Sequence, residues 1–180
     1  MPVRPILLLG HPDLYRRSSP VPEPVSDADY RSLLALIQDL SDTLEDFRAC
    51  RGEGQAISAP QIGMRTRLVF CPQDPFGGAV INPVLALFGP TLEVWEGCLS
   101  FPGLYVRVRR QAGCEVSYRD LEWRQRTVTV SGEASIVMQH EYDHLEGVLS
   151  VDRAIDGLSF SMIPPWPRRP RKRVEAPSSI

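Results

Sequence analysis

The segment VMQHEYDHLEGVL, residues 137–149, places two histidines four positions apart, with a glutamate directly after the first. The 180-residue chain has three histidines, and two of them, His140 and His144, lie in this segment. On a helix, positions i and i+4 project together about one turn apart, so both imidazoles can bind one ion while Glu141 reaches a water beside it. The pattern is typical of metal-assisted hydrolysis, and its alternative is a buried helix with hydrogen-bonded histidines.

A third ligand would decide between the two, because a catalytic divalent site usually combines three protein ligands with one open position. The segment EGCLS, residues 96–100, offers Cys98 beside a glycine that permits close approach, at the end of an expected strand. The other cysteines, Cys50, Cys71 and Cys114, are interpreted as small buried apolar residues. The sequence has no CxxC pair, and we expect no disulfides in a reducing compartment.

The spacing of apolar residues predicts two helices with strands between them. Residues 133–146 have helical spacing with the histidines facing the core, and Gly147 is the expected stop. Residues 65–132 contain short β-branched and aromatic runs separated by Gly, Pro and Asp, which predicts antiparallel strands. Residues 26–50 predict an amphipathic helix, whose apolar face is formed by Tyr30, Leu33, Leu34, Ile37, Leu40, Leu44 and Phe47.

Length and charge limit the possible classes of protein. The chain is long enough for one domain, and we expect residues 1–163 to form it and the Pro/Arg-rich residues 164–180 to form a flexible tail. With 20 basic and 22 acidic residues, no overall field recruits DNA or an anionic membrane. The apolar run near the N-terminus is too short for a signal sequence or a membrane span. We therefore expect a cytoplasmic protein.

Three segments together resemble the three motifs of the peptide deformylases. They are GEGQAISAPQIG (residues 52–63), EGCLS (96–100) and QHEYDHLEG (139–147), and the similarity covers roughly residues 5–155. The resemblance implies a compact, single-domain α+β fold with antiparallel β-sheets around the metal-bearing HExxH helix, together with the N-terminal helix. It also implies removal of the formyl group from the N-terminal formylmethionine of nascent polypeptides, with release of formate.

The resemblance implies a role for each matching residue. The metal ligands would be Cys98, His140 and His144, and Glu141 would be the general acid and base. The Gln61 side-chain amide and the Leu99 backbone N–H would stabilise the oxyanion. The resemblance suggests Fe2+ as the working metal, although two imidazoles and a thiolate also suit Zn2+, Ni2+ or Co2+.

Further positions follow from the same resemblance. A hydrogen-bonded ion pair would orient the ligands through Glu96, Asp143 and Arg110, and the alternative for these three is ordinary surface charge. Substrate binding would involve Gly54, Ala56, Val94, Tyr105, Ile136 and Val137.

The chain departs from the family pattern near the substrate. Gln55, Ala56 and Ser58 stand where the first motif usually has a hydrophobic residue, a glycine and an alanine, and Tyr105 stands where many members have arginine. Glu133 takes the place of a common apolar residue of the methionine pocket. We expect Glu133 to face outward at the helix start, where the helix dipole favours an anion, so that methionine preference survives.

Two other functions stay open at this point. One is an HExxH zinc peptidase, although such enzymes usually use a third histidine or a glutamate as ligand. The other is a catalytically silent deformylase-like binding protein, which would be expected to lose Glu141, Cys98 or Gln61. The basic run RRPRKR, residues 168–173, could also hold the enzyme near ribosomal RNA through phosphate contacts, and its alternative is a solubilising end.

Overall fold

The computed structural model describes residues 3–163 and 165 of the chain. In this part the two α-helices are α1 (Asp27–Arg51) and α2 (Glu133–Glu146), and short 3-10 turns are η1 (Pro12–Tyr15), η2 (Ala59–Ile62) and η3 (Ser150–Arg153). The expected tail, 164–180, and its basic run lie outside the described residues, apart from Pro165. The domain boundary at 163 therefore stays a prediction.

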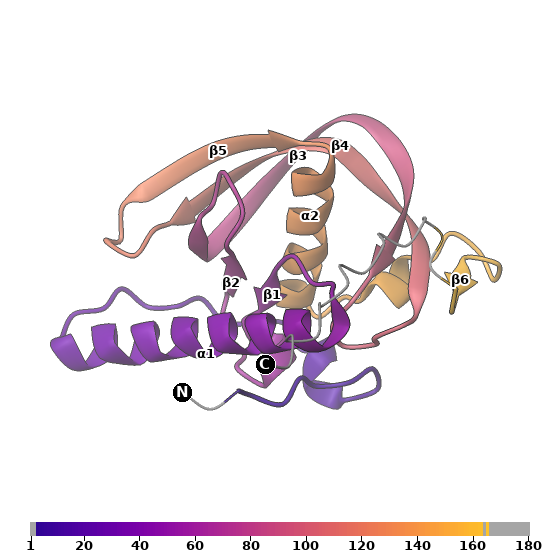
Figure 1. Ribbon diagram of the computed structural model, residues 1–180. Helices are drawn as coiled ribbons and strands as arrows, with labels where there is room; N and C mark the ends of the chain where they lie inside the picture. Colours follow the sequence, from indigo (N-terminus) through magenta and orange to yellow (C-terminus); the bar gives the residue numbers. More distant parts are fainter. Residues whose placement is uncertain (1–2, 164, 166–180) are drawn as a thin grey trace, which may run out of the picture.

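The described strands form a single antiparallel sheet, where we expected sheets in the plural. Its strands are β1 (Ile57–Ser58), β2 (Leu68–Cys71), β3 (Gly78–Gly97), β4 (Tyr105–Arg119), β5 (Gln125–Ser131) and β6 (Phe160–Ser161). They follow the order β1-β2-β3-β4-β5, and β6 pairs with the start of β4. Figure 1 shows the long strands β3, β4 and β5 curving over α2, while α1 lies across the open end. The expected α+β class is confirmed.

Strand β3 is longer than the sequence pattern suggested. We expected short runs separated by Gly, Pro and Asp, but β3 runs through Gly89 and Pro90 and stays paired with β4. The register shifts between Phe88 and Thr91, and Gly89 adopts a φ of 80° there. A bulge of this kind bends and twists a strand without ending it, which lets the sheet curl around α2.

Helix α1 begins and ends at local signals. Ser26 and Asp29 form a reciprocal capping box, and Gly52 ends the helix in the left-handed conformation. Its buried face packs on β1 and β2 through Leu33, Leu40 and Leu44. Two positions expected on that face, Tyr30 and Leu34, are instead exposed.

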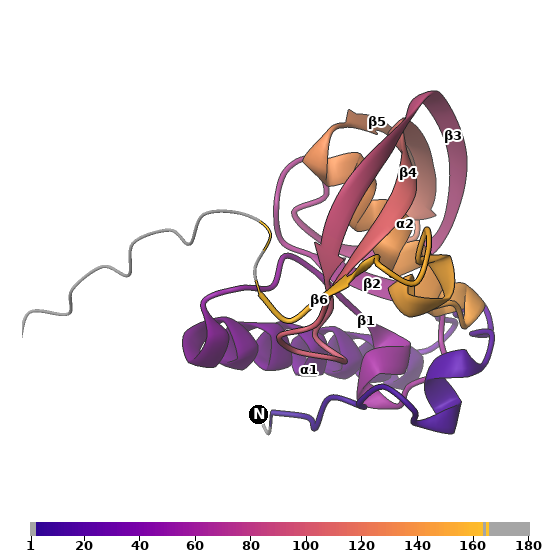
Figure 2. The same cartoon turned by 90° about the vertical axis from the view of Figure 1, so that its right-hand side faces the viewer.

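Helix α2 begins at Glu133 and ends before Gly147, as the sequence predicted. Gly147 has a φ of 74°, and a Cβ atom there would lie 2.7 Å from the backbone of Tyr15. Only glycine permits this approach, so the end of α2 is tied to η1. Figure 2 shows α2 inside the curl of the sheet, with Met138 and Leu145 in the core cluster.

Two further expectations can be checked in the described residues. All four cysteines are free, and Cys71 and Cys114 are buried as expected, but Cys50 is exposed near the end of α1. The interpretation of Cys50 as a buried apolar residue was wrong, because it faces an open groove between residues 3–8 and the last turns of α1. Neither α1 nor α2 combines the length and the apolar character needed to cross a membrane.

Candidate metal centre

Three side chains from two parts of the fold meet beneath the curled sheet. Cys98 follows the end of β3, and His140 and His144 project from α2. Their ligand atoms lie within 4.8 Å of one another, and all three residues are buried. Cys98 Sγ is 3.3 Å from Nε2 of His144, close to the roughly 3.5 Å expected between sulfur and nitrogen ligands of one tetrahedral ion. The donor set and its spacing therefore fit a divalent metal.

The turn after β3 aims the sulfur of Cys98 at the histidines. The backbone N–H of Ser100 approaches Sγ at 3.4 Å, and the Gln61 amide nitrogen approaches it at 3.6 Å. Both groups direct an N–H donor toward the sulfur of Cys98. A thiolate is the form that binds metal.

The two histidines have different surroundings. Nδ1 of His140 lies 3.0 Å from a carboxylate oxygen of Glu96, which leaves Nε2 for an ion. Burial lowers the pKa of His140, but the charges and hydrogen bonds of Cys98 and Glu96 outweigh this and hold it well above its usual range. Burial and the charge of His140 hold the pKa of His144 well below its usual range. Nδ1 of His144 is buried and has no hydrogen-bond partner among the described residues.

A buried ion-pair network supports His140 from behind. Arg110 donates to both oxygens of Glu96, at 2.7 and 3.0 Å, and to Asp143 at 2.6 Å. Burial raises the pKa of Glu96, but hydrogen bonds from His140 and Arg110 outweigh it and lower that pKa to about 2. Arg110 thus joins Glu96 to Asp143, and Glu96 connects this network to His140.

Arg153 belongs to the same network, and the sequence did not predict its role there. From η3 it donates to both oxygens of Asp143, each at 2.5 Å. Asp143 therefore accepts from two arginines at once, and Arg153 closes the network on its solvent side. No helical or motif spacing links Arg153 to the histidines, so only the fold reveals this contact.

Glu141 is buried beside the ligand group and points toward β1. Burial raises its pKa, while the neighbouring His140 and a hydrogen bond from Ser58 oppose that rise. The Ser58 hydroxyl donates to the Glu141 carboxylate in a short contact. A carboxylate with a raised pKa next to a metal site has the properties of a proton acceptor and donor.

Gln61 and Leu99 are both neighbours of Cys98, the first through its side chain and the second in the sequence. The Gln61 side chain is fully buried, and its Oε1 accepts from the backbone N–H of Ser58 at 2.9 Å. This fixes the amide so that its nitrogen end faces Cys98 and the Ser100 hydroxyl, the latter at 3.3 Å. Leu99 follows Cys98 directly and is also buried.

The positions expected to bind substrate are only partly brought together. Ala56 and the half-buried Val137 belong to one apolar cluster, whereas Val94 packs against another. Ile136 is half-buried on α2. Tyr105 is buried, and its hydroxyl lies 3.5 Å from a carboxylate oxygen of Glu53.

The expected substrate position at Gly54 is held by α1. Arg48 donates to the Gly54 carbonyl at 2.7 Å and to the Gln55 carbonyl at 3.0 Å. The segment before β1 is therefore fixed by the last turns of α1.

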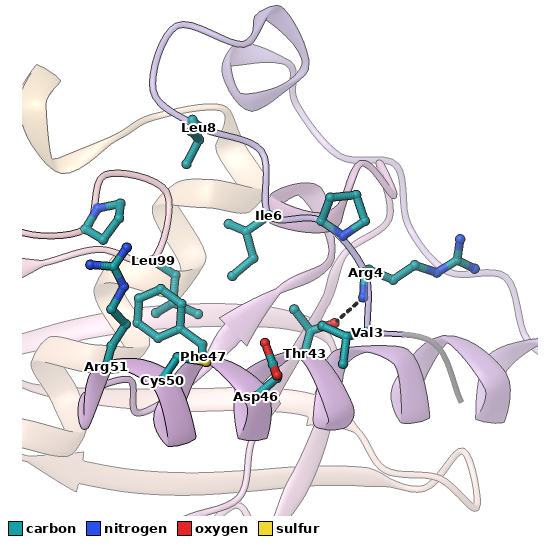
Figure 3. A pocket seen from close by; sticks show the side chains of 12 residues that line it. Val3, Arg4, Ile6, Leu8, Thr43, Asp46, Phe47, Cys50, Arg51 and Leu99 are labelled. Atoms are coloured by element: carbon teal, nitrogen blue, oxygen red, sulfur yellow. Dashed lines mark hydrogen bonds between the residues drawn. The ribbon is translucent and has the colours of Figure 1, made fainter.

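One groove near this region does not contain the metal ligands. It has a volume of about 500 Å³ and lies between residues 3–8 and the last turns of α1. Figure 3 shows Phe47 and Leu99 on its wall. Leu99 is the only one of the expected catalytic residues that reaches it among those described, so the groove lies behind the Cys98 turn and is distinct from the candidate site.

Comparison with known proteins agrees with this geometry. Residues 3–158 match the model of the polypeptide deformylase family. The chain is 38% identical over 174 residues to peptide deformylase 1 of Prochlorococcus marinus strain MIT 9313, covering 89% of this chain and 85% of that protein.

Solved structures show the same similarity. A peptide deformylase from Synechococcus elongatus in complex with actinonin aligns with a TM-score of 0.77 and 30% identity, over 88% of this chain and 82% of that one. The Thermotoga maritima peptide deformylase aligns with a TM-score of 0.74 and 31% identity, over 86% of this chain and 99% of that one. The chain therefore belongs to the polypeptide deformylase family, metal-dependent enzymes that remove the N-terminal formyl group from nascent polypeptides.

Proposed function

We propose that the chain deformylates N-formylmethionyl peptides with a single divalent ion held by Cys98, His140 and His144. The observation that carries this assignment is the buried group of one sulfur and two imidazoles within 4.8 Å. Three protein ligands leave a fourth position open, as a hydrolytic site requires. The bound ion would make a water acidic enough to act as a nucleophile near neutral pH.

Glu141 is proposed as the group that moves the proton. Its carboxylate takes a proton from the attacking water and returns it to the departing amine nitrogen, so formate and a free N-terminal amine are the products. The raised pKa of Glu141, caused mainly by burial, suits a group that must both accept and donate near neutral pH.

Two donors are proposed for the oxygen that gains negative charge. They are the Gln61 side-chain N–H and the Leu99 backbone N–H, both from neighbours of Cys98. Because the Gln61 amide is already fixed by Ser58 N–H at 2.9 Å, it need not reorganise as charge develops. Removing one such donor typically costs a hundredfold or more in rate, about 3 kcal/mol.

The buried network is proposed to orient the metal ligands. Glu96 fixes the ring of His140 through Nδ1, and Arg110 holds Glu96 against Asp143. A buried charge network of this kind keeps a ligand in one tautomer and one orientation.

We propose Fe2+ as the working metal in the cell, with Zn2+, Ni2+ or Co2+ as other occupants. A thiolate with two imidazoles accepts any of these ions, so ligand type alone does not select one. Metal analysis and specific activity of protein purified without oxygen, then reloaded with each ion, would identify the working metal.

We propose that the methionine side chain contacts Val94, Ile136 and Val137, and that the peptide backbone lies along Gly54, Ala56 and Tyr105. These are the positions carried over from the motif resemblance. Gly54 is well suited to a backbone contact because Arg48 already fixes its carbonyl.

The location and partners of the enzyme in the cell are proposed from the charge of the chain and from its C-terminal sequence. We propose a cytoplasmic enzyme without affinity for DNA or membranes, whose domain spans residues 1–163. The basic run 168–173 would hold it at the ribosome surface through salt-sensitive phosphate contacts. Co-sedimentation with ribosomes at low salt should weaken when residues 164–180 are deleted, and unchanged co-sedimentation would remove this role.

Formate release tests the proposed function against the two alternatives. Metal-loaded protein should release formate from a formyl-Met peptide and should leave an acetyl-blocked peptide of the same sequence uncleaved. A zinc peptidase would instead cut internal bonds of the acetylated peptide, and a silent binding protein would give neither product.

A further inference from the structure

One serine contacts both of the groups proposed for proton transfer and oxyanion binding. Ser58 ends strand β1, pairs with Val69 of β2 and has no solvent exposure. Its backbone N–H donates to Gln61 Oε1 at 2.9 Å. Its hydroxyl donates to the Glu141 carboxylate and lies 3.1 Å from the Glu141 backbone carbonyl.

The two contacts of Ser58 depend on the sequence in different ways. The contact with Gln61 uses the main chain, so any residue except proline keeps it. The contact with Glu141 uses the hydroxyl, so it requires serine or threonine. Alanine, which the first motif usually has here, keeps the Gln61 contact and loses the Glu141 contact.

We propose that Ser58 is a positioning residue that holds the Glu141 carboxylate in its reactive orientation through the side-chain hydroxyl. The inference rests on the proposed function, since it assigns Ser58 a role in the reaction that Glu141 performs.

The geometry shows what such a partner contributes to Glu141. A glutamate side chain has three rotatable bonds, and one in a catalytic site must hold a carboxylate oxygen within hydrogen-bond reach of the reacting atoms. Misplacement by about 1 Å can cost a hundredfold in rate. The Ser58 hydroxyl occupies Oε2 and leaves Oε1 for the attacking water and the departing amine.

The scaffold around Ser58 is rigid enough to fix that carboxylate. Ser58 is fully buried on a paired strand, and its hydroxyl meets both the side chain and the main chain of the residue that it orients. Sites supported by strands hold their geometry more closely than sites on loops. The hydroxyl thereby links β1 to α2 across 83 residues of sequence.

Ser58→Ala tests the proposal because it removes only the Glu141 contact. We expect kcat for formate release to fall about tenfold, with unchanged KM, metal content and melting temperature. Ser58→Thr, which restores a hydroxyl, should recover kcat to within about threefold of wild type.

Ser150→Ala is the matched control. Ser150 is also a buried serine, and its hydroxyl has no hydrogen-bond partner among the described residues. Its replacement removes a buried hydroxyl of the same size without touching Glu141. We expect kcat to stay at the wild-type value.

A double-mutant comparison separates positioning from a general structural role. If Ser58 acts through Glu141, Ser58→Ala should leave the residual rate of Glu141→Ala unchanged, because the carboxylate is already absent. A crystal structure of Ser58→Ala should also show the Glu141 carboxylate in a new orientation.

Four results would overturn the proposal. The first three are wild-type kcat in Ser58→Ala, the same fold-loss in the Glu141→Ala background, and loss of metal from Ser58→Ala. The fourth is a stably folded Ser58→Thr that is as slow as Ser58→Ala. Wild type is measured in the same assay, so failure of the proposed function would appear separately, as an inactive wild-type enzyme.

Discussion

Gln55, just before β1, and Glu133, the first residue of α2, share a hydrogen bond in which Gln55 Nε2 donates to Glu133 Oε1 at 2.5 Å. These are two of the positions where the chain departs from the family pattern toward polar residues. Glu133 is exposed, so its carboxylate keeps its hydration and pairs with Gln55 at the surface. The outward orientation expected for Glu133 agrees with this contact.

We therefore expect the enzyme to prefer substrates with an N-terminal formylmethionine. We expect wild type to have higher kcat/KM for formyl-Met and formyl-norleucine peptides than for formyl-Gln and formyl-Lys peptides. Glu133→Leu should change that ratio by less than about threefold, because an exposed group contributes little to an apolar pocket.

Val137→Ala is the comparison variant for this measurement. It removes two carbons from a proposed pocket wall and should lower kcat/KM for formyl-Met by roughly tenfold. A wild-type preference for the polar residues that Glu133→Leu reverses would show that Glu133 lines the pocket.

Mutations should distinguish the proposed metal ligand, Cys98, from the proposed general base, Glu141. Cys98→Ala should lose the metal, since it removes a coordinating atom, whereas Glu141→Ala should keep the metal and lose turnover by about a hundredfold or more. Metal stoichiometry and formate release measured on both variants check this. An active Glu141→Ala enzyme would show that its assigned role is wrong.

The local parts of this fold could be predicted because their signals are local. The capping box at Ser26 and the glycine at Gly147 define the helix ends within a few residues. The pair His140 and His144 follows from one helical turn. Cys98 could be joined to them only through the motif resemblance, because its contact with His144 spans 46 residues.

The contacts that the sequence did not predict join elements that are far apart in the chain. Ser58 was visible as a departure from the motif, but its partner Glu141 lies on another element. Arg153 gave no signal, because an arginine after a helix is usually a surface charge. The continuous strand β3 was missed because glycine and proline usually end strands, whereas here they form a bulge.

The end of α2 provides a stability prediction with an internal control. Gly147→Ala should destabilise the protein by about 2–4 kcal/mol, because it adds backbone strain at positive φ and a clash with the Tyr15 backbone. Gly52→Ala, at the same φ of 74° but with nothing within 4 Å, should cost only about 1 kcal/mol. Urea unfolding of both variants measures the difference, and equal losses would rule out the contact with Tyr15 as its cause.

The buried carboxylate of Glu96 predicts how stability depends on pH. Its pKa falls from 4.5 to about 2 on folding, so its contribution is complete above pH 4.5 and is lost as pH falls toward 2. The shift corresponds to about 3 kcal/mol. Unfolding free energies of chelator-treated protein between pH 6 and 3 should decline less steeply in Glu96→Gln than in wild type. Identical slopes would show that Glu96 is not the group responsible.

The most direct test of the proposed function follows both products of one reaction. Anaerobically prepared, Fe2+-loaded protein is incubated with a formyl-Met-Ala-Ser peptide, and formate and free N-terminal amine are quantified together. We expect equal amounts of the two products, at a rate that Glu141→Ala lowers by about a hundredfold or more although its metal is retained. No formate from wild type with bound metal, or cleavage at an internal peptide bond, would contradict it.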